Sequence, residues 1–427
     1  MIAMFMFVVV LALLMVGIPV AFVFGTVSIA FAFLIPELGY EVFNILPFRI
    51  YGIMSNTTLM AVPLFIAMGL ILEKSLMAER LLVAMSSMFR GVRGGLAVSV
   101  VLVGAMLAAS TGIVSASVVM MSVIALPLML RAGYDKGLAS GTVAASGTLG
   151  QIIPPSIILI ILGDVMSVSV GELFMGAVLP GLVLVALYVV YILVRAYFNP
   201  DVAPVAKEVK EVSIKEIIIS IVPPMLLMMS VLGSIFLGIA SPTESAAFGV
   251  IGALLLAVLN KSLNFEMLKY ASLESVKLSG MIFMILIGAT AFSLVFSELG
   301  GNDLILEFFS QDIGDVWIFI AIAMISIFLL GFFIDFIEIC FIVVPILVPV
   351  MSAFGIDPVW FGVLIALNLQ ASFLTPPFGL SLFFLKGAAG DSITTMDMYR
   401  GIIPFILLQF VALLLVIMFP NLVFAFI

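Results

Sequence analysis

The sequence contains no histidine, a single cysteine and few charged residues. Without histidine the chain cannot form a bis-histidine haem site, a histidine metal site or a histidine proton relay. Cys340 cannot form a disulfide within the chain, and a small buried hydrophobe is the expected role for it. Charged residues are 9% of the chain and show no basic cluster, so nothing indicates nucleic-acid binding. The first basic residue is Arg49, and the N-terminus therefore lacks the positive region of a secretory signal peptide.

Apolar residues, in contrast, dominate the sequence. The chain is 65% hydrophobic, its mean hydropathy is +1.42, and apolar runs of 18 or more residues recur along it. These properties predict an all-α polytopic membrane protein. The sequence has no Walker, kinase or zinc-protease motif, so we expect neither ATP-driven pumping nor an enzyme.

The longest uncharged stretch lies between Arg93 and Arg131 and is 37 residues long. One helix of that length would measure about 55 Å, against a hydrocarbon core of about 30 Å. Both ends carry arginine, which favours the same side of the membrane. The chain is therefore predicted to enter and return as a re-entrant hairpin over about 94–131, with Ser110-Thr111-Gly112 near its turning point.

The next apolar segment, 135–165, is long enough to span once but contains Pro154-Pro155 in its middle. Two adjacent prolines remove two amide donors, so a continuous helix is not expected there. Unwound backbone at membrane depth is tolerated only where it is buried in protein or lines a cavity. We therefore predict a broken span beside the hairpin, and together they form a candidate cradle for an ion and a substrate.

The same pattern returns 222 residues later. Pro127, Asp135 and Pro154-Pro155 match Pro349, Asp357 and Pro376-Pro377 at that single offset. The copy predicts a second hairpin at about 316–356 and a second broken span at 357–385. Asp335 and Glu338 lie at the turning point of this second hairpin, and acidic residues inside a membrane are costly enough to be functional candidates.

A polar stretch at 199–216 divides the chain near its middle and is predicted to be a cytoplasmic linker between repeats at 1–198 and 217–427. Met1–Ile35, interrupted by Gly17-Ile18-Pro19, is interpreted as two short spans, and 73–93 as an amphipathic helix along the membrane surface. With the linker inside, every Lys and Arg except Arg49 falls on the cytoplasmic side. Each half then has five spans, so the two repeats are predicted to be inverted. Inverted repeats with paired hairpins and broken helices are typical of alternating-access transporters, and a passive channel is the weaker alternative.

These residues also carry a family resemblance over nearly the whole chain. It resembles the large membrane subunit of tripartite ATP-independent periplasmic (TRAP) transporters, and the matching motifs are Ala109-Ser110-Thr111-Gly112, Gly150–Ser156, Ser241–Ala247, Gly331–Asp335 and Thr375–Gly379. Ser241 and Ser245 stand where the family usually has alanine.

The resemblance implies a sodium-coupled importer of organic acids, such as C4-dicarboxylates or sialic acid, in the cytoplasmic membrane of a bacterium or archaeon. It also implies an elevator-like mechanism, no cofactor other than the coupling sodium ions, and two partners: a small four-helix membrane subunit and a periplasmic substrate-binding protein. A stand-alone sodium-coupled anion symporter of similar architecture remains the alternative.

Sodium prefers hard oxygen ligands, which unwound carbonyls and hydroxyls near half-helix ends supply. The first predicted site combines the tip of hairpin one with the first break, and the second combines the tip of hairpin two with the second break. The predicted sodium-binding residues are Ser110, Thr111, Gly112, Gly147, Thr148 and Ser156 for the first site, and Gly331, Asp335 and Thr375 for the second. The alternative is structural: the hydroxyls bond across packed helices, and Asp335 bonds to free amides at the hairpin tip.

The organic anion is expected between the two hairpin tips, where half-helix N-termini point partial positive charge at carboxylates. Neither hairpin nor the centre of either break contains Lys or Arg. Bound anion therefore has to rely on helix dipoles, hydroxyl and amide donors, and sodium. The predicted substrate-binding residues are Ser110, Ser156, Asn368 and Thr375.

Overall fold

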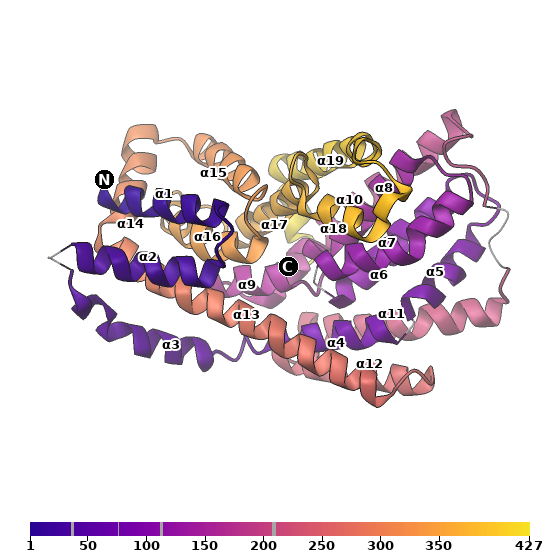
Figure 1. The fold of residues 1–427 in the computed structure, drawn as a ribbon, viewed down its shortest axis with the longest axis horizontal. Coiled ribbons are helices and arrows are strands. Elements are labelled where there is room, and N and C mark those ends of the chain that lie inside the picture. Colours follow the sequence, from indigo (N-terminus) through magenta and orange to yellow (C-terminus); the bar gives the residue numbers. More distant parts are fainter. Residues whose placement is uncertain (36–37, 76, 112–113, 207–210) are drawn as a thin grey trace.

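The computed structural model describes residues 1–35, 38–75, 77–111, 114–206 and 211–427, and the side chains at positions 40, 108–111 and 312 lie outside this description (Figure 1). Within these residues the secondary structure is helical. The first half contains α1 (Ile2–Met15), α2 (Val20–Leu34), η1 (Tyr40–Ile45), α3 (Leu46–Met54), α4 (Ala61–Lys74), α5 (Met77–Met88), α6 (Gly95–Thr111), α7 (Val114–Arg131), α8 (Lys136–Thr148), η2 (Leu149–Gln151), α9 (Ile157–Val165) and α10 (Val170–Phe198).

The second half begins with α11 (Ile214–Phe236) and α12 (Pro242–Leu259). It continues with α13 (Phe265–Glu298), α14 (Gly301–Glu307), η3 (Phe308–Ile313), α15 (Val316–Leu330), α16 (Phe336–Ala353), α17 (Pro358–Leu374), α18 (Leu380–Ala389), η4 (Gly390–Ser392), α19 (Thr395–Met418) and α20 (Asn421–Phe424). Shifting α7 by 222 residues gives the bounds of α16, and the same shift brings α8 and α17 to a common first residue.

Seven of the described helices are long and apolar enough to cross a membrane, or up to eight if the bent pair α4 and α5 is one span. This confirms a helical multi-pass protein. The seven include α7 and α16, which the sequence predicts as hairpin arms, whereas α1, α2, α15 and α17 are apolar but shorter. The division into spans and the repeat boundaries stay predictions.

Local sequence explains where the repeated helices end and begin. Gly133 and Gly355 follow α7 and α16 with φ of +81° and +64°, a conformation in which glycine has no Cβ penalty. Two residues later, Asp135 accepts a hydrogen bond from Leu138 N at 2.9 Å, and Asp357 accepts one from Trp360 N at 2.9 Å. Both aspartates cap the next helix, so the repeated Gly-x-Asp motif ends one helix and begins the next.

One boundary differs from the prediction. Helix α11 begins at Ile214, inside the predicted linker 199–216, because Ser213 and Glu216 form a capping box. The linker is therefore shorter than polarity alone predicts. After α13 the chain forms α14 and η3.

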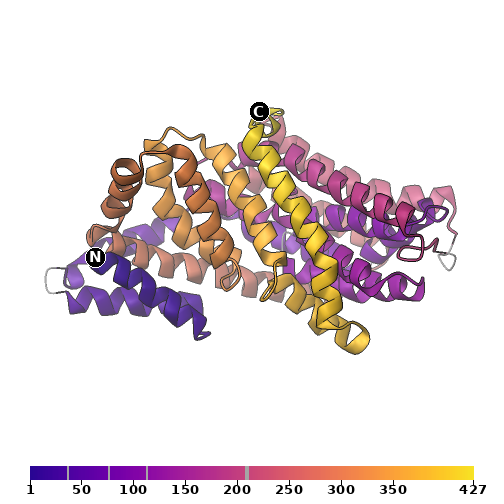
Figure 2. The ribbon, with the colours of Figure 1, turned by 90° about the horizontal axis from the view of Figure 1, so that it is seen from above.

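The helices form two groups that lie side by side. Helices α2, α4, α12 and α13 pack on one another, with α11 against α12, and occupy the lower part of Figure 1. The hairpin helices and broken helices, together with α10 and α19, occupy its upper part, and Figure 2 shows α19 crossing this group. We call the first group the frame and the second the hairpin group.

Within the hairpin group the two halves of the chain interlock. Helix α7 packs on α18 and α16 on α9, so the returning arm of each hairpin contacts the short half-helix of the other half. Likewise α8 packs on α19 and α17 on α10. The ends of the two hairpins consequently face a common central region.

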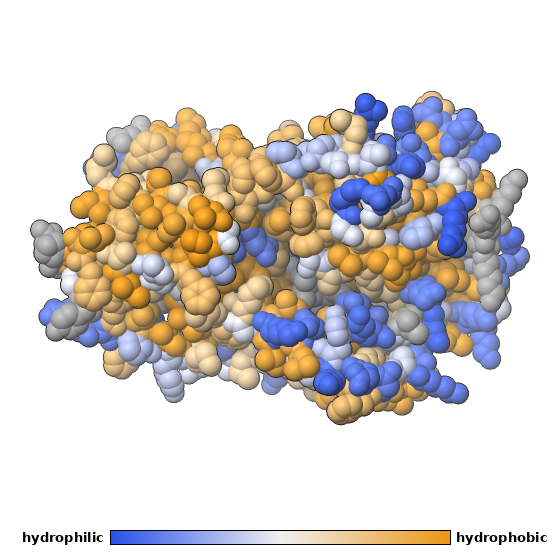
Figure 3. Space-filling view, in the orientation of Figure 1, coloured by the Kyte–Doolittle hydropathy of each residue, from blue (hydrophilic) through white to orange (hydrophobic). Residues whose placement is uncertain are grey.

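The surface carries the apolar character of the sequence. Figure 3 shows hydrophobic residues over most of the left half and hydrophilic residues gathered over the right half of that face. Large apolar side chains are exposed along the outer helices, including Phe5 at 63%, Phe33 at 65% and Phe248 at 65%. Such a surface suits lipid rather than water.

Candidate transport site

A cavity of about 360 Å³ lies where the two hairpins meet. Hairpin one contributes Val114 and Ser115 at the start of α7, and hairpin two contributes Asp335, Phe336 and Glu338. The two broken spans and the frame complete the wall with residues that include Ile157, Phe373 and Leu380, and Ile66, Leu278 and Met281. Both halves of the chain therefore build one cavity at the place where the sequence predicts the substrate.

Two carboxylates enter this apolar cavity from the N-terminus of α16. Asp335 is the N-cap residue, and its Oδ1 accepts a hydrogen bond from Phe336 N at 2.6 Å. Glu338 Oε2 accepts one from Asp335 N at 3.2 Å, which completes a capping box. Each carboxylate is partly buried and lines the cavity. The capping interactions fit a structural role for Asp335, whereas its place on the cavity wall fits an ion-binding role.

The first predicted sodium site is described only in part. Gly112 lies outside the described residues, as do the side chains of Ser110 and Thr111. Of the remaining residues, Thr148 Oγ1 donates to Ala145 O at 2.9 Å, and Ser156 Oγ donates to Gln151 O at 2.7 Å at the start of α9. Both hydroxyls are buried and lie on either side of the break, so their assignment to sodium stays a prediction.

Gly147 is the remaining member of that site, and it has a clear packing role. A Cβ added there would lie 2.9 Å from Val118 Cα and 3.0 Å from Val118 N. Glycine is therefore required for the close approach of α8 and the hairpin arm α7.

The second predicted site brings hairpin two against the broken helix α17. Gly331 ends α15, and an added Cβ would meet Ser372 Oγ, with Ser372 Cβ at 2.9 Å. Thr375 is the C-cap of α17, and its Oγ1 donates to Ala371 O at 2.8 Å. Asn368 is buried, and its Nδ2 donates to Met324 O of α15 at 2.7 Å. Asn368 and Thr375 do not line the 360 Å³ cavity, and their substrate-binding role stays a prediction.

One contact at the centre links equivalent positions of the two halves. Gln370 Nε2 lies 3.4 Å from Thr148 Oγ1, and these residues are 222 positions apart. The contact joins α8 to α17, which begin 222 residues apart. The offset of 222 residues makes the two positions equivalent in the sequence, but the contact between Gln370 and Thr148 depends on how α8 and α17 cross.

The cavity carries acidic groups and no basic one among its described lining residues. No group of three or more His, Cys, Asp or Glu side chains in the described part of the chain could hold a metal ion.

Comparison with known proteins decides the family. The family model for the tripartite ATP-independent periplasmic transporter, DctM component, matches residues 7–422. The chain belongs to this family. Its members are transporter subunits of the inner membrane and not enzymes, so this large permease is a multi-pass transport protein.

Curated relatives cover nearly its whole length. The sialic acid TRAP transporter large permease protein SiaM of Vibrio cholerae is 30% identical over 96% of this chain and 95% of its own. The C4-dicarboxylate protein DctM of Pseudomonas aeruginosa is 29% identical over 88% of this chain and 87% of its own. The ectoine protein TeaC of Halomonas elongata is 29% identical over 96% and 95%.

Solved structures support the fold. The YdaH transporter of Alcanivorax borkumensis superposes with a TM-score of 0.63 at 12% identity, over 96% of this chain and 98% of that one. MtrF of Neisseria gonorrhoeae gives a TM-score of 0.57 at 14% identity, over 88% and 83%. At these identities the likeness concerns the fold alone.

Proposed function

We propose that this large permease is a sodium-coupled secondary importer of an organic acid, with the acid bound in the 360 Å³ cavity between the hairpins. The observation that carries the proposal is the convergence of both hairpin ends and Asp335 on that one cavity. The names of the relatives, for sialic acid and for C4-dicarboxylates, suggest the substrate class. Because none of the described residues that line the cavity is basic, a bound sodium ion would offset the charge of both Asp335 and the substrate.

The proposal includes an inverted repeat and an elevator movement. The recurrence of elements at an offset of 222, the interlocked packing of the halves and the Thr148–Gln370 contact support the repeat. The hairpin group is packed as one body around the cavity, and the frame lies along one side of it. In the proposed cycle the hairpin group carries the cavity past the frame.

The proposal also includes the two partners that the family name implies: a small membrane subunit and a periplasmic protein that delivers the substrate. Co-purification of this chain with a small membrane subunit tests the first partner. Uptake that reaches full rate without the periplasmic protein would contradict the second and favour the stand-alone symporter.

The decisive experiment compares two aspartates with the same structural role. Asp335 caps α16 at the cavity, and Asp357 caps α17 outside the cavity lining. Uptake of succinate and N-acetylneuraminate is measured in proteoliposomes with the partner subunits, under an imposed sodium gradient. Asp335→Asn keeps a good N-cap but removes the charge, and we expect it to abolish sodium-driven uptake. Asp357→Asn should transport normally.

Sodium-driven uptake that survives in Asp335→Asn would assign this residue to capping alone. Wild-type uptake that ignores the sodium gradient would refute the coupling. Ser110→Ala tests the first site in the same assay, and we expect a higher sodium concentration at half-maximal rate.

A further inference from the structure

A second cavity adjoins the first. It has a volume of about 650 Å³ and lies between hairpin arm α7 and the frame helices α4 and α13, with α5 beside it. Ser115, Leu278 and Phe384 line both cavities. The two spaces therefore adjoin at these residues, and we call the second one the vestibule. For the inference below we take the two as one path.

The vestibule differs from the central cavity in its charge. Glu73, Glu79 and Glu274 line it, and Lys74 is the only Lys or Arg among the described residues that line either cavity. An organic anion in this path passes three carboxylates and meets one cation. Among the described residues that line these cavities, Lys74 therefore offers an organic anion its only favourable full charge.

The ammonium group of Lys74 is weakly engaged. Its Nζ lies 3.9 Å from Glu73 Oε1 and 4.3 Å from the centroid of the Tyr270 ring. An ammonium has three hydrogen-bond donors, and the contacts described for Lys74, to Glu73 and to the Tyr270 ring, are both longer than a hydrogen bond. Its side chain is 42% exposed, so an incoming carboxylate can reach it.

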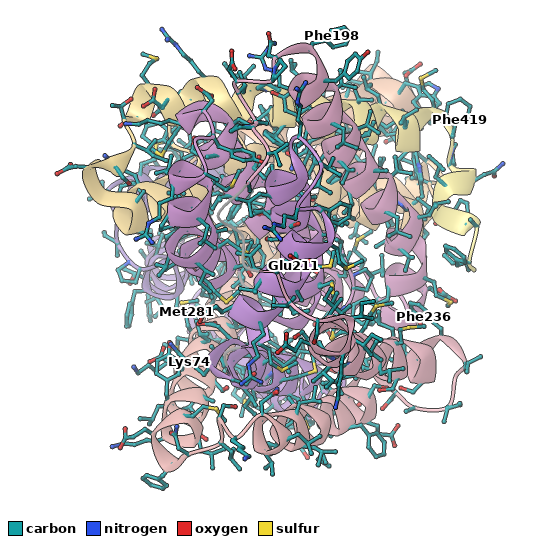
Figure 4. All side chains as sticks on the ribbon, turned by 90° about the vertical axis from the view of Figure 1, so that its right-hand side faces the viewer. Lys74, Phe198, Glu211, Phe236, Met281 and Phe419 are labelled. Carbon is teal, nitrogen blue, oxygen red and sulfur yellow. The ribbon has the colours of Figure 1, made fainter. Side chains whose placement is uncertain are left out.

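The neighbouring Glu73 shows the same incomplete pairing. Its side chain is 14% exposed, and its buried Oε2 has no hydrogen-bond partner. Figure 4 shows Lys74 of the vestibule and Met281 of the central cavity on the same side of the molecule in that view. The ion pair is therefore loose, and both of its residues line the vestibule.

We propose that Lys74 is a carboxylate-binding residue of the vestibule, which holds the organic acid between the central cavity and the cytoplasm while Glu73 competes for the same ammonium. The inference rests on the proposed function, because it takes the substrate to be an organic anion. The Tyr270 ring keeps the ammonium over the path through a cation–π contact. The carboxylate of the organic acid replaces Glu73 as the partner of Lys74. It is released into solution when Glu73 pairs with the ammonium again.

Ser115→Cys offers a direct reporter of occupancy, because Ser115 lies where the two cavities join. The native Cys340 is fully buried, so it contributes little background. The complex with its small membrane subunit is labelled with an uncharged maleimide in the presence of increasing succinate or N-acetylneuraminate. The measured quantity is the acid concentration that halves the labelling rate.

We expect Lys74→Gln to raise this concentration about tenfold, because it removes a charge-assisted hydrogen bond. Lys74→Arg should restore protection to within about threefold, and Glu73→Gln should act in the opposite direction by removing the competing carboxylate. Protection in the wild type should weaken as salt increases. The matched control is Lys215→Gln, since Lys215 is exposed on α11 and lines neither cavity.

The inference is overturned if Lys74→Gln and Lys215→Gln give the same half-protection concentration, or if Glu73→Gln weakens protection. It is also overturned if an acid that the wild type transports fails to protect Ser115→Cys. Failure of the proposed function has a different signature: the wild-type complex then takes up neither acid.

Discussion

The contact between α8 and α19 gives a sharp test of the packing in the hairpin group. A Cβ added to Gly401 would meet the carbonyl group of Gly137, and it would lie 2.8 Å from Gly137 Cα, whereas ordinary contacts are 3.4–4 Å. All three atoms are backbone, so no side-chain rotation can relieve the clash. Gly401→Ala therefore forces the two helices apart.

The expected magnitude follows from two opposing terms. Overpacking costs about 1–3 kcal/mol. Replacing glycine by alanine within a helix recovers about 1 kcal/mol of helix propensity. Because the clash is with backbone atoms, we take the upper end of the overpacking cost. The free energy of unfolding should then fall by about 2 kcal/mol, and at about 2.1 cal/mol/K of unfolding entropy per residue the midpoint of thermal unfolding should fall by roughly 2 °C.

Two other glycines calibrate the measurement. Gly280 on α13 has no atom within 4 Å of an added Cβ, so Gly280→Ala should leave the midpoint unchanged or raise it slightly. At Gly176 on α10 the nearest atoms are methyl groups, Val423 Cγ1 at 2.9 Å and Val359 Cγ1 at 3.1 Å. These methyl groups can shift, so Gly176→Ala should fall between the other two variants.

The assay is thermal unfolding in detergent, followed by the loss of monodisperse protein in size-exclusion chromatography. The order Gly280→Ala, Gly176→Ala, Gly401→Ala from most to least stable is the expected result. Equal midpoints for Gly401→Ala and Gly280→Ala would refute the close approach of α8 and α19.

Two further predictions concern contacts at the ends of helices. Asn56 Nδ2 donates to Asp164 Oδ1 at 2.5 Å and joins the loop before α4 to α9 of the hairpin group. Asn56→Ala should shift the balance between arrangements of the two groups by roughly fivefold. A changed labelling rate of Ser115→Cys without substrate would report that shift, and an unchanged rate would mean that the bond does not bias the cycle. Ser241 and Glu244 form a capping box at α12, so Ser241→Ala should cost about 1 kcal/mol and Ser241→Asn much less. Equal unfolding midpoints for these two variants would contradict the capping role.

The sequence by itself determined where the chain stops and restarts its helices. Pro154-Pro155 and Pro376-Pro377 interrupt two apolar spans, and the Gly-x-Asp motifs end one helix and cap the next. These are local effects, since proline, glycine and N-cap aspartate act within one or two turns. The repeat offset of 222 and the family could therefore be read from the residues, as could Asp335 as an acid at a hairpin tip.

Only the tertiary structure decided which of these local features meet. Gly137 and Gly401 resemble every other glycine in a sequence that has 35 of them, and their importance comes from the approach of two helices far apart in the chain. In the sequence Lys74 is one of several charges in an amphipathic segment. The packing of α7 against α4 and α13 places it on the wall of the vestibule. Close approach and enclosure depend on the relative placement of distant helices, which side-chain packing sets and short-range sequence patterns do not encode.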